Sequence, residues 1–244
     1  MKSGGRPMDP PAALLIVTGM AREVRLASGP GVETIASGGD TPGLRARLPA
    51  RTGPVPRLVL SFGIAGGLDP ALDPGALIIA IGVQAGAQRW PANAHIATRM
   101  AGIFRSAGVP IAIADLAGVD HPLLGASDKT ALWERTNAAT VDMESHIAAA
   151  YAAEHGIPFA AIRAVCDPAE RSLPAWIGAA LKPDGGTDIP AILRHLAAQP
   201  THLPQLVRLA RDANAAFQSL RRCRDLLGIG RGRADLVELL GDVA

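Results

Sequence analysis

Hydrophobic residues along the chain occur in short unbroken runs that are separated by longer amphipathic segments. Five runs are apolar almost throughout, at residues 14–17, 58–60, 77–83, 111–113 and 159–165. Such runs are typical of strands that are buried on both faces of a parallel or mixed sheet. A weaker run at 32–36 is a further candidate strand.

Segments with helical spacing lie between and after these runs. We expect helices over about residues 95–107, 127–136, 143–155 and 203–227, and a short one beginning at Asp188. Ser127 and Asp188 are of the types that cap helix N-termini, and Gly156 suits a helix C-terminus. Strands and helices alternate without a repeat or a linker, which predicts an α/β fold: a single domain with a central mixed β-sheet flanked by helices.

The domain is expected to span residues 12–228, preceded by a disordered N-terminus at 1–11 and followed by a tail at 229–244. The net charge is +2 and aromatic residues make up 3% of the 244 positions, so the composition gives no reason to expect nucleic-acid binding. The two cysteines exclude a disulfide framework and suit a reducing compartment. No run reaches the roughly 18 apolar residues of a membrane-spanning helix. We therefore expect a cytoplasmic protein.

Three carboxylates lie just after predicted strands: Glu23, Glu144 and Asp167. Ligands of open α/β folds bind beyond the strand ends, so these positions are candidates for a site. Each of them alone is more often a helix-terminus charge or a solvated loop residue. Asp167 is the exception, because it closes a strand buried on both faces, where a carboxylate is costly without a partner or a function.

A glycine-rich turn over residues 61–68 follows the run at 58–60, and a smaller one holds Gly38 and Gly39. Glycines allow backbone amides to approach an anion or a sugar. The spacing matches neither the dinucleotide-binding fingerprint nor the P-loop. A plain tight turn therefore remains the alternative at both places.

Four motifs in order resemble the purine nucleoside phosphorylase and methylthioadenosine nucleosidase superfamily: GMxxE at 19–23, FGxAGGL at 62–68, VDME at 141–144 and RAVCD at 163–167. The resemblance covers roughly residues 12–200. Within the superfamily, the chain is most similar to the hopanoid-associated phosphorylase branch. The similarity lies in the residues at 142–146 and 166–169 and in the short segment between Glu23 and Ser61. That branch is associated with the removal of adenine from adenosylhopane.

The resemblance implies a role for each acid in breaking the purine–ribose bond. Asp167 would be the general acid that protonates the purine at N7, for which it must hold a proton in the bound complex. Glu144 would accept hydrogen bonds from the ribose hydroxyls, with Met143 against the sugar. Glu23 would be the second catalytic residue, the one that activates water in the nucleosidases.

The resemblance also implies a phosphate site and further substrate contacts. Arg22, Gly38, Gly39, Gly63 and Ile64 would bind phosphate, the one possible co-substrate, and no cofactor or metal is expected. Ile64 departs from the family pattern, because many members carry a serine there. The remaining substrate contacts would come from Gly66 and His121.

The expected activity is cleavage of an adenine nucleoside, with adenosylhopane giving adenine and free or phosphorylated ribosylhopane. A hydrolase of the methylthioadenosine or adenosylhomocysteine type and a non-catalytic nucleoside-binding protein are the alternatives. The resemblance further implies a homo-oligomer. A hopanoid lipid partner would need an apolar lip, for which Trp176 and Ile177 are candidates. The arginines of segment 203–227 would contact the inner face of the membrane or form a solvated basic face.

Overall fold

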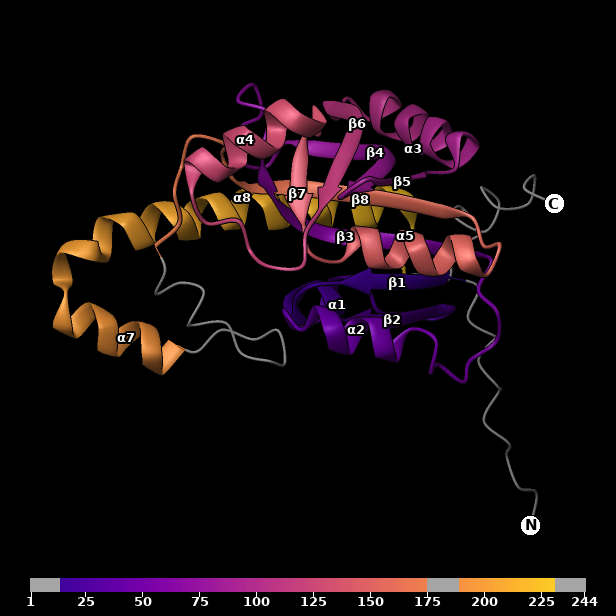
Figure 1. Ribbon diagram of the computed structural model, residues 1–244, viewed down its shortest axis with the longest axis horizontal. Coiled ribbons are helices and arrows are strands. Elements are labelled where there is room, and N and C mark those ends of the chain that lie inside the picture. The colour runs from indigo at the N-terminus through magenta and orange to yellow at the C-terminus, as the bar shows by residue number, and fades with distance from the viewer. Residues whose placement is uncertain (1–13, 175–188, 231–244) are drawn as a thin grey trace, which may run out of the picture.

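The computed structural model describes residues 14–174 and 189–230, and Figure 1 shows their arrangement. The strands are β1 (Leu14–Thr18), β2 (Val32–Ala36), β3 (Leu58–Gly67), β4 (Leu77–Ala85), β5 (Gln88–Pro91), β6 (Ile111–Gly118), β7 (Thr140–Asp142) and β8 (Phe159–Asp167). The helices are α1 (Ala21–Ala27), α2 (Thr41–Arg47), α3 (Ala94–Ser106), α4 (Ala126–Thr136), α5 (Ser145–Glu154), α7 (Ile189–Ala198), the 3₁₀ helix η1 (Pro200–His202) and α8 (Leu203–Leu227).

The eight strands form one mixed sheet that closes on itself over part of its width. The hydrogen-bonded order is β2-β1-β3-β7-β6-β4-β5, and β8 pairs with both β3 and β4. The pairs β3–β7, β4–β8 and β4–β5 are antiparallel and the others are parallel. Strands β3, β8, β4, β6 and β7 thus make a closed ring, and the ends of β3, β7 and β8 meet at one rim.

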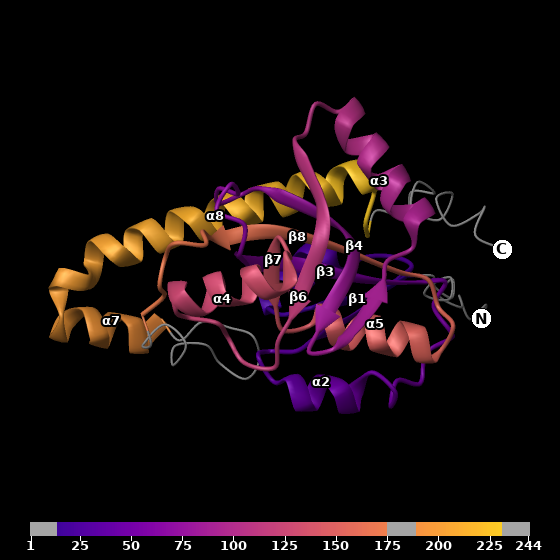
Figure 2. The same ribbon diagram turned by 45° about the horizontal axis from the view of Figure 1, so that its top comes forward.

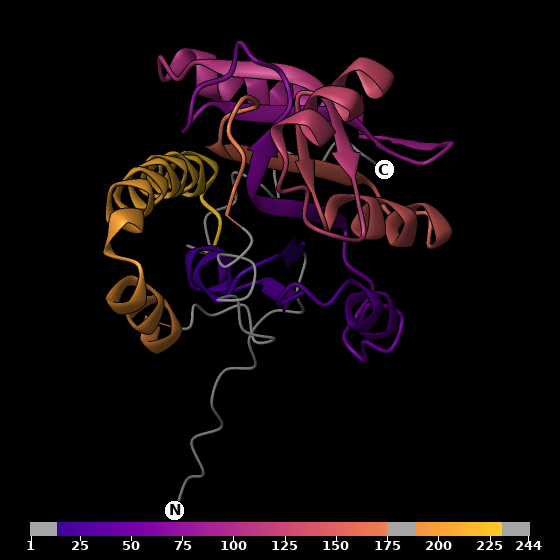
Figure 3. The same ribbon diagram turned by 60° about the vertical axis from the view of Figure 1, so that its left-hand side comes forward.

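Helices cover both faces of this sheet. Helix α8 lies against β8 and β3 with α1 and α3 beside it, whereas α5 contacts β3, β4, β6 and β8 from the other side, with α2 next to it. Figure 3 shows α8 and α5 on opposite sides of the strands. The structure confirms the predicted single-domain α/β fold with a central mixed sheet flanked by helices.

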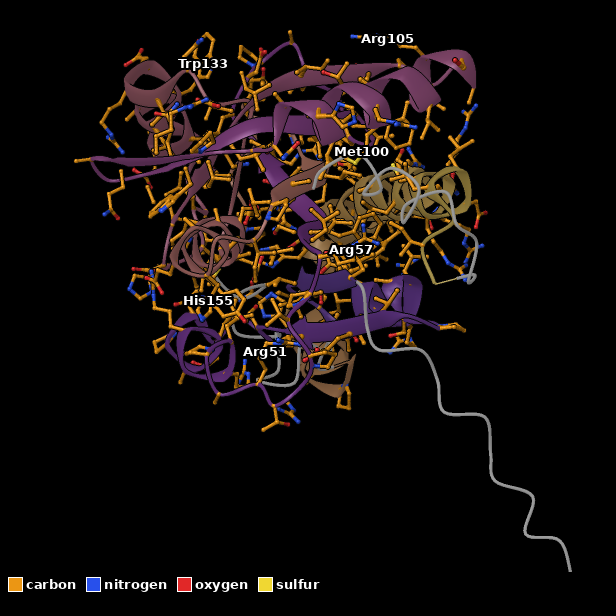
Figure 4. The ribbon with its side chains drawn as sticks, turned by 90° about the vertical axis from the view of Figure 1, so that its right-hand side faces the viewer. Arg51, Arg57, Met100, Arg105, Trp133 and His155 are labelled. Atoms are coloured by element: carbon orange, nitrogen blue, oxygen red, sulfur yellow. The ribbon has the colours of Figure 1, made fainter. Side chains whose placement is uncertain are left out.

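The apolar face of α3 points inward, as the spacing predicts. Met100 of α3 is 1% exposed and packs in the core between α3, the sheet and α8, whereas Arg105 of the same helix points outward (Figure 4). The first half of α8, together with α7, extends beyond the sheet as an arm (Figures 1 and 2). Leu203 and Val207 of this arm are 51% and 49% exposed.

Several predicted elements differ in detail. Helix α8 has the predicted bounds, but the glycine-rich segment is not a turn: residues 61–67 continue β3, because they pair with β8 from Ser61 to Gly66. Helices α1 and α2 were not among the predicted helices. Gly125, not Ser127, is the N-cap of α4.

The predictions for the two termini and for one loop concern mainly residues outside the described ranges. These are residues 1–11, the tail from 231 onward, Asp188, and the candidate lip at Trp176 and Ile177. Ile229, assigned to the tail, is 1% exposed and belongs to the core beside α8. The core therefore continues past residue 228.

Candidate active site

A cavity of about 190 Å³ opens at the rim where β3, β7 and β8 end. Its walls come from the loop after β1, the end of β3, the β7–α5 junction, the end of β8 and the segment before α4. The lining includes Gly19, Met20, Glu23, Gly38, Gly39, Ile64, Gly66, Val119, Leu123, Leu124, Met143, Glu144, Cys166, Asp167 and Leu173.

Glu23 is buried at the start of α1 and is held by backbone amides. It is the third residue of the helix, and its Oε2 accepts hydrogen bonds of 2.7 Å from the N–H groups of Gly19 and Met20, as in half of a capping box. Its Oε1 accepts a third, also of 2.7 Å, from Ile64 of β3. Burial raises the pKa of Glu23, and the nearby Arg163 and these amides only partly offset it. A carboxylate whose pKa is raised in this way is better suited to act as a general base.

Glu144 lies across the cavity at the N-terminus of α5. Ser37 donates a hydrogen bond of 2.6 Å to its Oε1, and Arg163 Nη2 lies 3.8 Å from its Oε2. Burial raises the pKa of Glu144 to about 7; Arg163 opposes this rise and Asp142 adds to it. A Cβ atom at Gly19 would lie 3.0 Å from Glu144 Oε1, so the chain needs a residue without a side chain beside this carboxyl.

Arg163 is a fully buried cation behind the two glutamates. Its Nε and Nη2 donate hydrogen bonds of 3.0 Å to the two carboxylate oxygens of Asp142, and Nη2 also donates to the hydroxyls of Ser61 and Ser145 at 2.6 and 2.9 Å. Among the described residues, Nη1 has no hydrogen-bond partner. A Cβ atom at Gly63 would lie 2.6 Å from this Nη1 and 2.5 Å from Glu23 Oε1. The free donor therefore lies beside the Glu23 carboxylate.

Asp167 ends β8 and faces the cavity opposite Gly66. The two residues are partners in the β3–β8 register, just after a bulge between Ala65 and Gly66. Asp167 is 3% exposed, its Oδ2 is ion-paired with the fully buried Lys129, and its Oδ1 accepts a hydrogen bond of 2.9 Å from Cys166 Sγ. The partner that a buried carboxylate needs is thus a lysine of α4.

The structure brings most of the predicted site residues to this one cavity. Those along its wall are Glu23, Gly38, Gly39, Ile64, Gly66, Met143, Glu144 and Asp167. Gly63 lies directly behind the Glu23 carboxylate.

Two predicted site residues lie elsewhere. Successive residues of a helix point about 100° apart, so Glu23 facing inward turns Arg22 toward α8. The Arg22 guanidinium lies 3.9 Å from the centre of the Phe217 ring and lines a separate cavity. His121 is exposed and does not line the central cavity, whose wall at that point is formed by Val119 and Leu123. Arg22 and His121 therefore lie outside the central cavity, contrary to their expected positions.

Two residues that matter in this geometry were not among the candidates: Arg163 and Lys129. Arg163 interrupts the apolar run at 159–165, and a charged residue inside a strand buried on both faces is a signal of a buried ion pair. Lys129 gives no comparable signal, since a lysine in the second turn of a helix is ordinarily exposed.

The arrangement gathers three buried carboxyl groups around one small cavity, with the buried cations Arg163 and Lys129 beside them, which is typical of a site for a polar small molecule. The chain belongs to the phosphorylase superfamily: the family model matches residues 54–181, more than half of its length. This confirms the prediction of an enzyme of the nucleoside phosphorylase or nucleosidase type.

Several solved structures are similar in fold to this chain. A Helicobacter pylori MTAN mutant with 5′-methylthioadenosine in its active site has a TM-score of 0.58 and 14% identity, over 88% of this chain and 99% of that one. The Campylobacter jejuni 5′-methylthioadenosine/S-adenosylhomocysteine nucleosidase has a TM-score of 0.56 and 12% identity, over 86% and 99%. Futalosine hydrolase of Helicobacter pylori has a TM-score of 0.54 and 16% identity, over 63% and 87%. No curated protein sequence matches the chain.

Two further observations concern the described part of the chain alone. None of its helices has both the length and the apolar character needed to span a membrane. It also contains no group of three histidine, cysteine, aspartate or glutamate side chains arranged to hold a metal ion.

Proposed function

We propose that this protein cleaves the C1′–N9 bond of an adenine nucleoside by hydrolysis. The observation that carries the proposal is the convergence of Glu23, Glu144 and Asp167 on one cavity. Breaking this bond develops positive charge on the sugar and electron density on the purine. The three acids supply what such a reaction needs: a base for the nucleophile, an anchor for the sugar and a proton route to the purine.

In the proposed reaction, Glu144 accepts hydrogen bonds from the ribose hydroxyls. A water molecule in the cavity lies against Glu23, and its oxygen bonds to C1′ as its proton passes to Glu23. The electron pair of the C1′–N9 bond leaves with the purine, and N7 takes up a proton from Asp167. Adenine therefore departs as a neutral molecule.

Hydrolysis is favoured over phosphorolysis by two contacts. Arg22, the candidate phosphate ligand, stacks on Phe217 away from the cavity. The backbone N–H of Ile64, a second candidate, already donates to Glu23. A phosphate ion would thus meet neither donor.

We propose adenosylhopane as the specific substrate, since the sequence is similar to the hopanoid-associated branch. One wall of the cavity is apolar, with Val119, Leu123, Leu124 and Leu173, and this wall would receive a hydrocarbon 5′ group. The arm of α7 and α8 exposes Leu203 and Val207 beside Arg208 and Arg211. Exposed apolar residues next to cations fit an anionic membrane surface, so we place the enzyme at the inner face of the membrane.

A nucleosidase acting on 5′-methylthioadenosine or S-adenosylhomocysteine is the second candidate. It is supported by the fold shared with the Campylobacter jejuni enzyme of that name. That reaction would use the same three acids and would differ only in the 5′ group that meets the apolar wall.

The test measures adenine release from adenosylhopane, 5′-methylthioadenosine and S-adenosylhomocysteine, each with and without phosphate. A kcat/KM at least about tenfold higher for adenosylhopane supports the hopanoid assignment. A preference for the small sulfur nucleosides would replace it with the second candidate. Tight binding without any adenine release would mean a non-catalytic nucleoside-binding protein.

The homo-oligomer stays a prediction, and light scattering after size exclusion measures the mass of the assembly.

A further inference from the structure

Lys129 occupies an unusual place for a lysine. It lies in the second turn of α4 and its side chain has no exposed surface. Lysine is almost never fully buried unless it is paired, because an unpaired ammonium loses its hydration. The contacts of the Lys129 ammonium must therefore offset its loss of hydration.

The ammonium of Lys129 uses all of its donors on the end of β8 and the turn that follows. It donates to Asp167 Oδ2, to the carbonyl of Pro168 at 3.0 Å and to the carbonyl of Arg171 at 3.1 Å. An ammonium has three N–H donors, and each has an acceptor here. The two carbonyl bonds tie the turn to α4, which a neutral donor could also do. The bond to Asp167 joins a full charge to the cavity wall.

Lys129 stands behind Asp167 as seen from the cavity. Asp167 lines the cavity and Lys129 does not. The other oxygen of Asp167 accepts from the Cys166 thiol, whose pKa burial raises far above its usual value, so this group is a poor proton source. Lys129 is thus the cation that touches Asp167 without reaching the substrate.

We infer that Lys129 is a positioning residue for Asp167 and the source of the proton that Asp167 passes to the purine. This inference rests on the proposed function. An ion-paired carboxylate has no proton of its own to give, whereas the ammonium beside it has one. As the C1′–N9 bond breaks, the proton moves from Nζ to Oδ2 and from Oδ2 to N7. Lys129 is left as a neutral amine, Asp167 as a carboxylate and adenine as the neutral N7–H form. The amine regains a proton from solution after adenine leaves.

Two neutral variants test this route. Lys129→Met keeps the apolar stem and removes the ammonium, and Lys129→Gln keeps a neutral N–H donor for the anchor. Arg135→Met, an exposed cation of the same helix, is the matched control. Each protein is measured for kcat and KM on the adenine nucleoside that the wild type cleaves fastest, from about pH 5 to pH 10. Thermal unfolding and adenine affinity check that each variant is folded.

Both Lys129 variants should lose at least about 100-fold in kcat at neutral pH, with KM within about threefold of the wild type. The alkaline limb of their kcat profile should move at least about one pH unit toward acid, because a carboxyl group is a stronger acid than an ammonium group and is the donor that remains. Arg135→Met should behave as the wild type.

Recovery of kcat to within about threefold in Lys129→Gln would overturn the inference, since a neutral anchor would then suffice. So would a loss of rate with the alkaline limb unmoved. The wild type gives a readout without any variant: a kcat that already falls between about pH 6 and pH 8 on the alkaline side rules out an ammonium as proton source. A wild type that releases no adenine from any nucleoside would instead remove the proposed function itself.

Discussion

The Glu23 carboxylate accepts a hydrogen bond of 2.7 Å from the backbone N–H of Ile64, across 41 positions of the chain. This contact joins the first turn of α1 to β3 at the floor of the cavity. It also occupies an amide that the resemblance implied for phosphate. Under the proposed function, the orientation of Glu23 is therefore linked to the choice of nucleophile.

The rate of adenine release should be the same, within about twofold, with and without phosphate. Arg22→Ala should leave kcat unchanged for the same reason, because Arg22 contacts Phe217 and not the cavity. Its cost should be confined to stability, about 0.5–1 kcal/mol for an exposed cation–π contact. Initial rates and thermal unfolding measure the two effects. A rate that rises with phosphate and loses this dependence in Arg22→Ala would restore the phosphorylase assignment.

Gly63→Ala should lower both activity and stability, although it adds only one methyl group. The added Cβ would lie 2.5 Å from Glu23 Oε1, which accepts from Ile64, and 2.6 Å from Nη1 of the buried Arg163, which is held by its other two nitrogens. Displacing them should lower kcat/KM at least about tenfold and cost about 1–3 kcal/mol of stability. Gly102→Ala in α3 is the control, since nothing lies within 4 Å of its Cβ position and alanine favours a helix. Equal activity of the two variants would contradict this placement of Glu23 and Arg163.

Substrate binding should strengthen as the pH rises through about 7, where Glu144 loses its proton. Below this pH the protonated carboxyl has fewer free acceptor positions for the ribose hydroxyls, and above it the carboxylate can accept from both. KM should therefore fall with rising pH, and Glu144→Gln should remove this dependence. The exposed Glu134→Gln on α4 should keep it. The same group should make folding less favourable as the pH rises from 4.5 to about 7, because the buried carboxyl ionises later than an unfolded one.

Asp167→Asn should lower kcat by about 10²–10⁴-fold and change KM little. The amide keeps the shape of the side chain but cannot take a proton from Lys129 and pass it on. Steady-state kinetics measure the loss, and Asp73→Asn, an exposed acid, should retain full activity. Unchanged turnover in Asp167→Asn would refute the role of this residue as the acid.

Arg163→Met should be among the most destabilising single changes in the site. It would leave Asp142 buried without its cation and would remove the positive charge beside Glu144 and Glu23. Breaking a buried ion pair from one side costs about 3–5 kcal/mol. Denaturant unfolding measures this, with the exposed Arg105→Met as a comparison that should stay within about 0.5 kcal/mol of the wild type. A similar stability of both variants would contradict the buried ion pair between Arg163 and Asp142.

Much of the fold could be predicted because its signals are local. Strands β1, β4 and β8 are buried along most of their length, so they appear as nearly continuous apolar runs. The 25 residues of α8 keep one apolar stripe, and the predicted bounds of this helix agree with the structure. The glycine-rich segment was misinterpreted because glycine is common in turns, whereas here it lets β3 pass close to Glu23, Arg163 and Asp167.

The sequence by itself determined that this is an α/β protein and that Glu23, Glu144 and Asp167 follow strand ends. Both features follow from the pattern of apolar and polar residues over short stretches of the chain. Only the tertiary structure decided what stands beside each acid. Lys129 meets Asp167 from 38 positions away and Arg163 meets Asp142 from 21, through the packing of α4 and the closure of the strand ring. The direction of Arg22 depended in the same way on α8 covering α1. Such partners depend on distances between distant segments, which no local pattern of residues encodes.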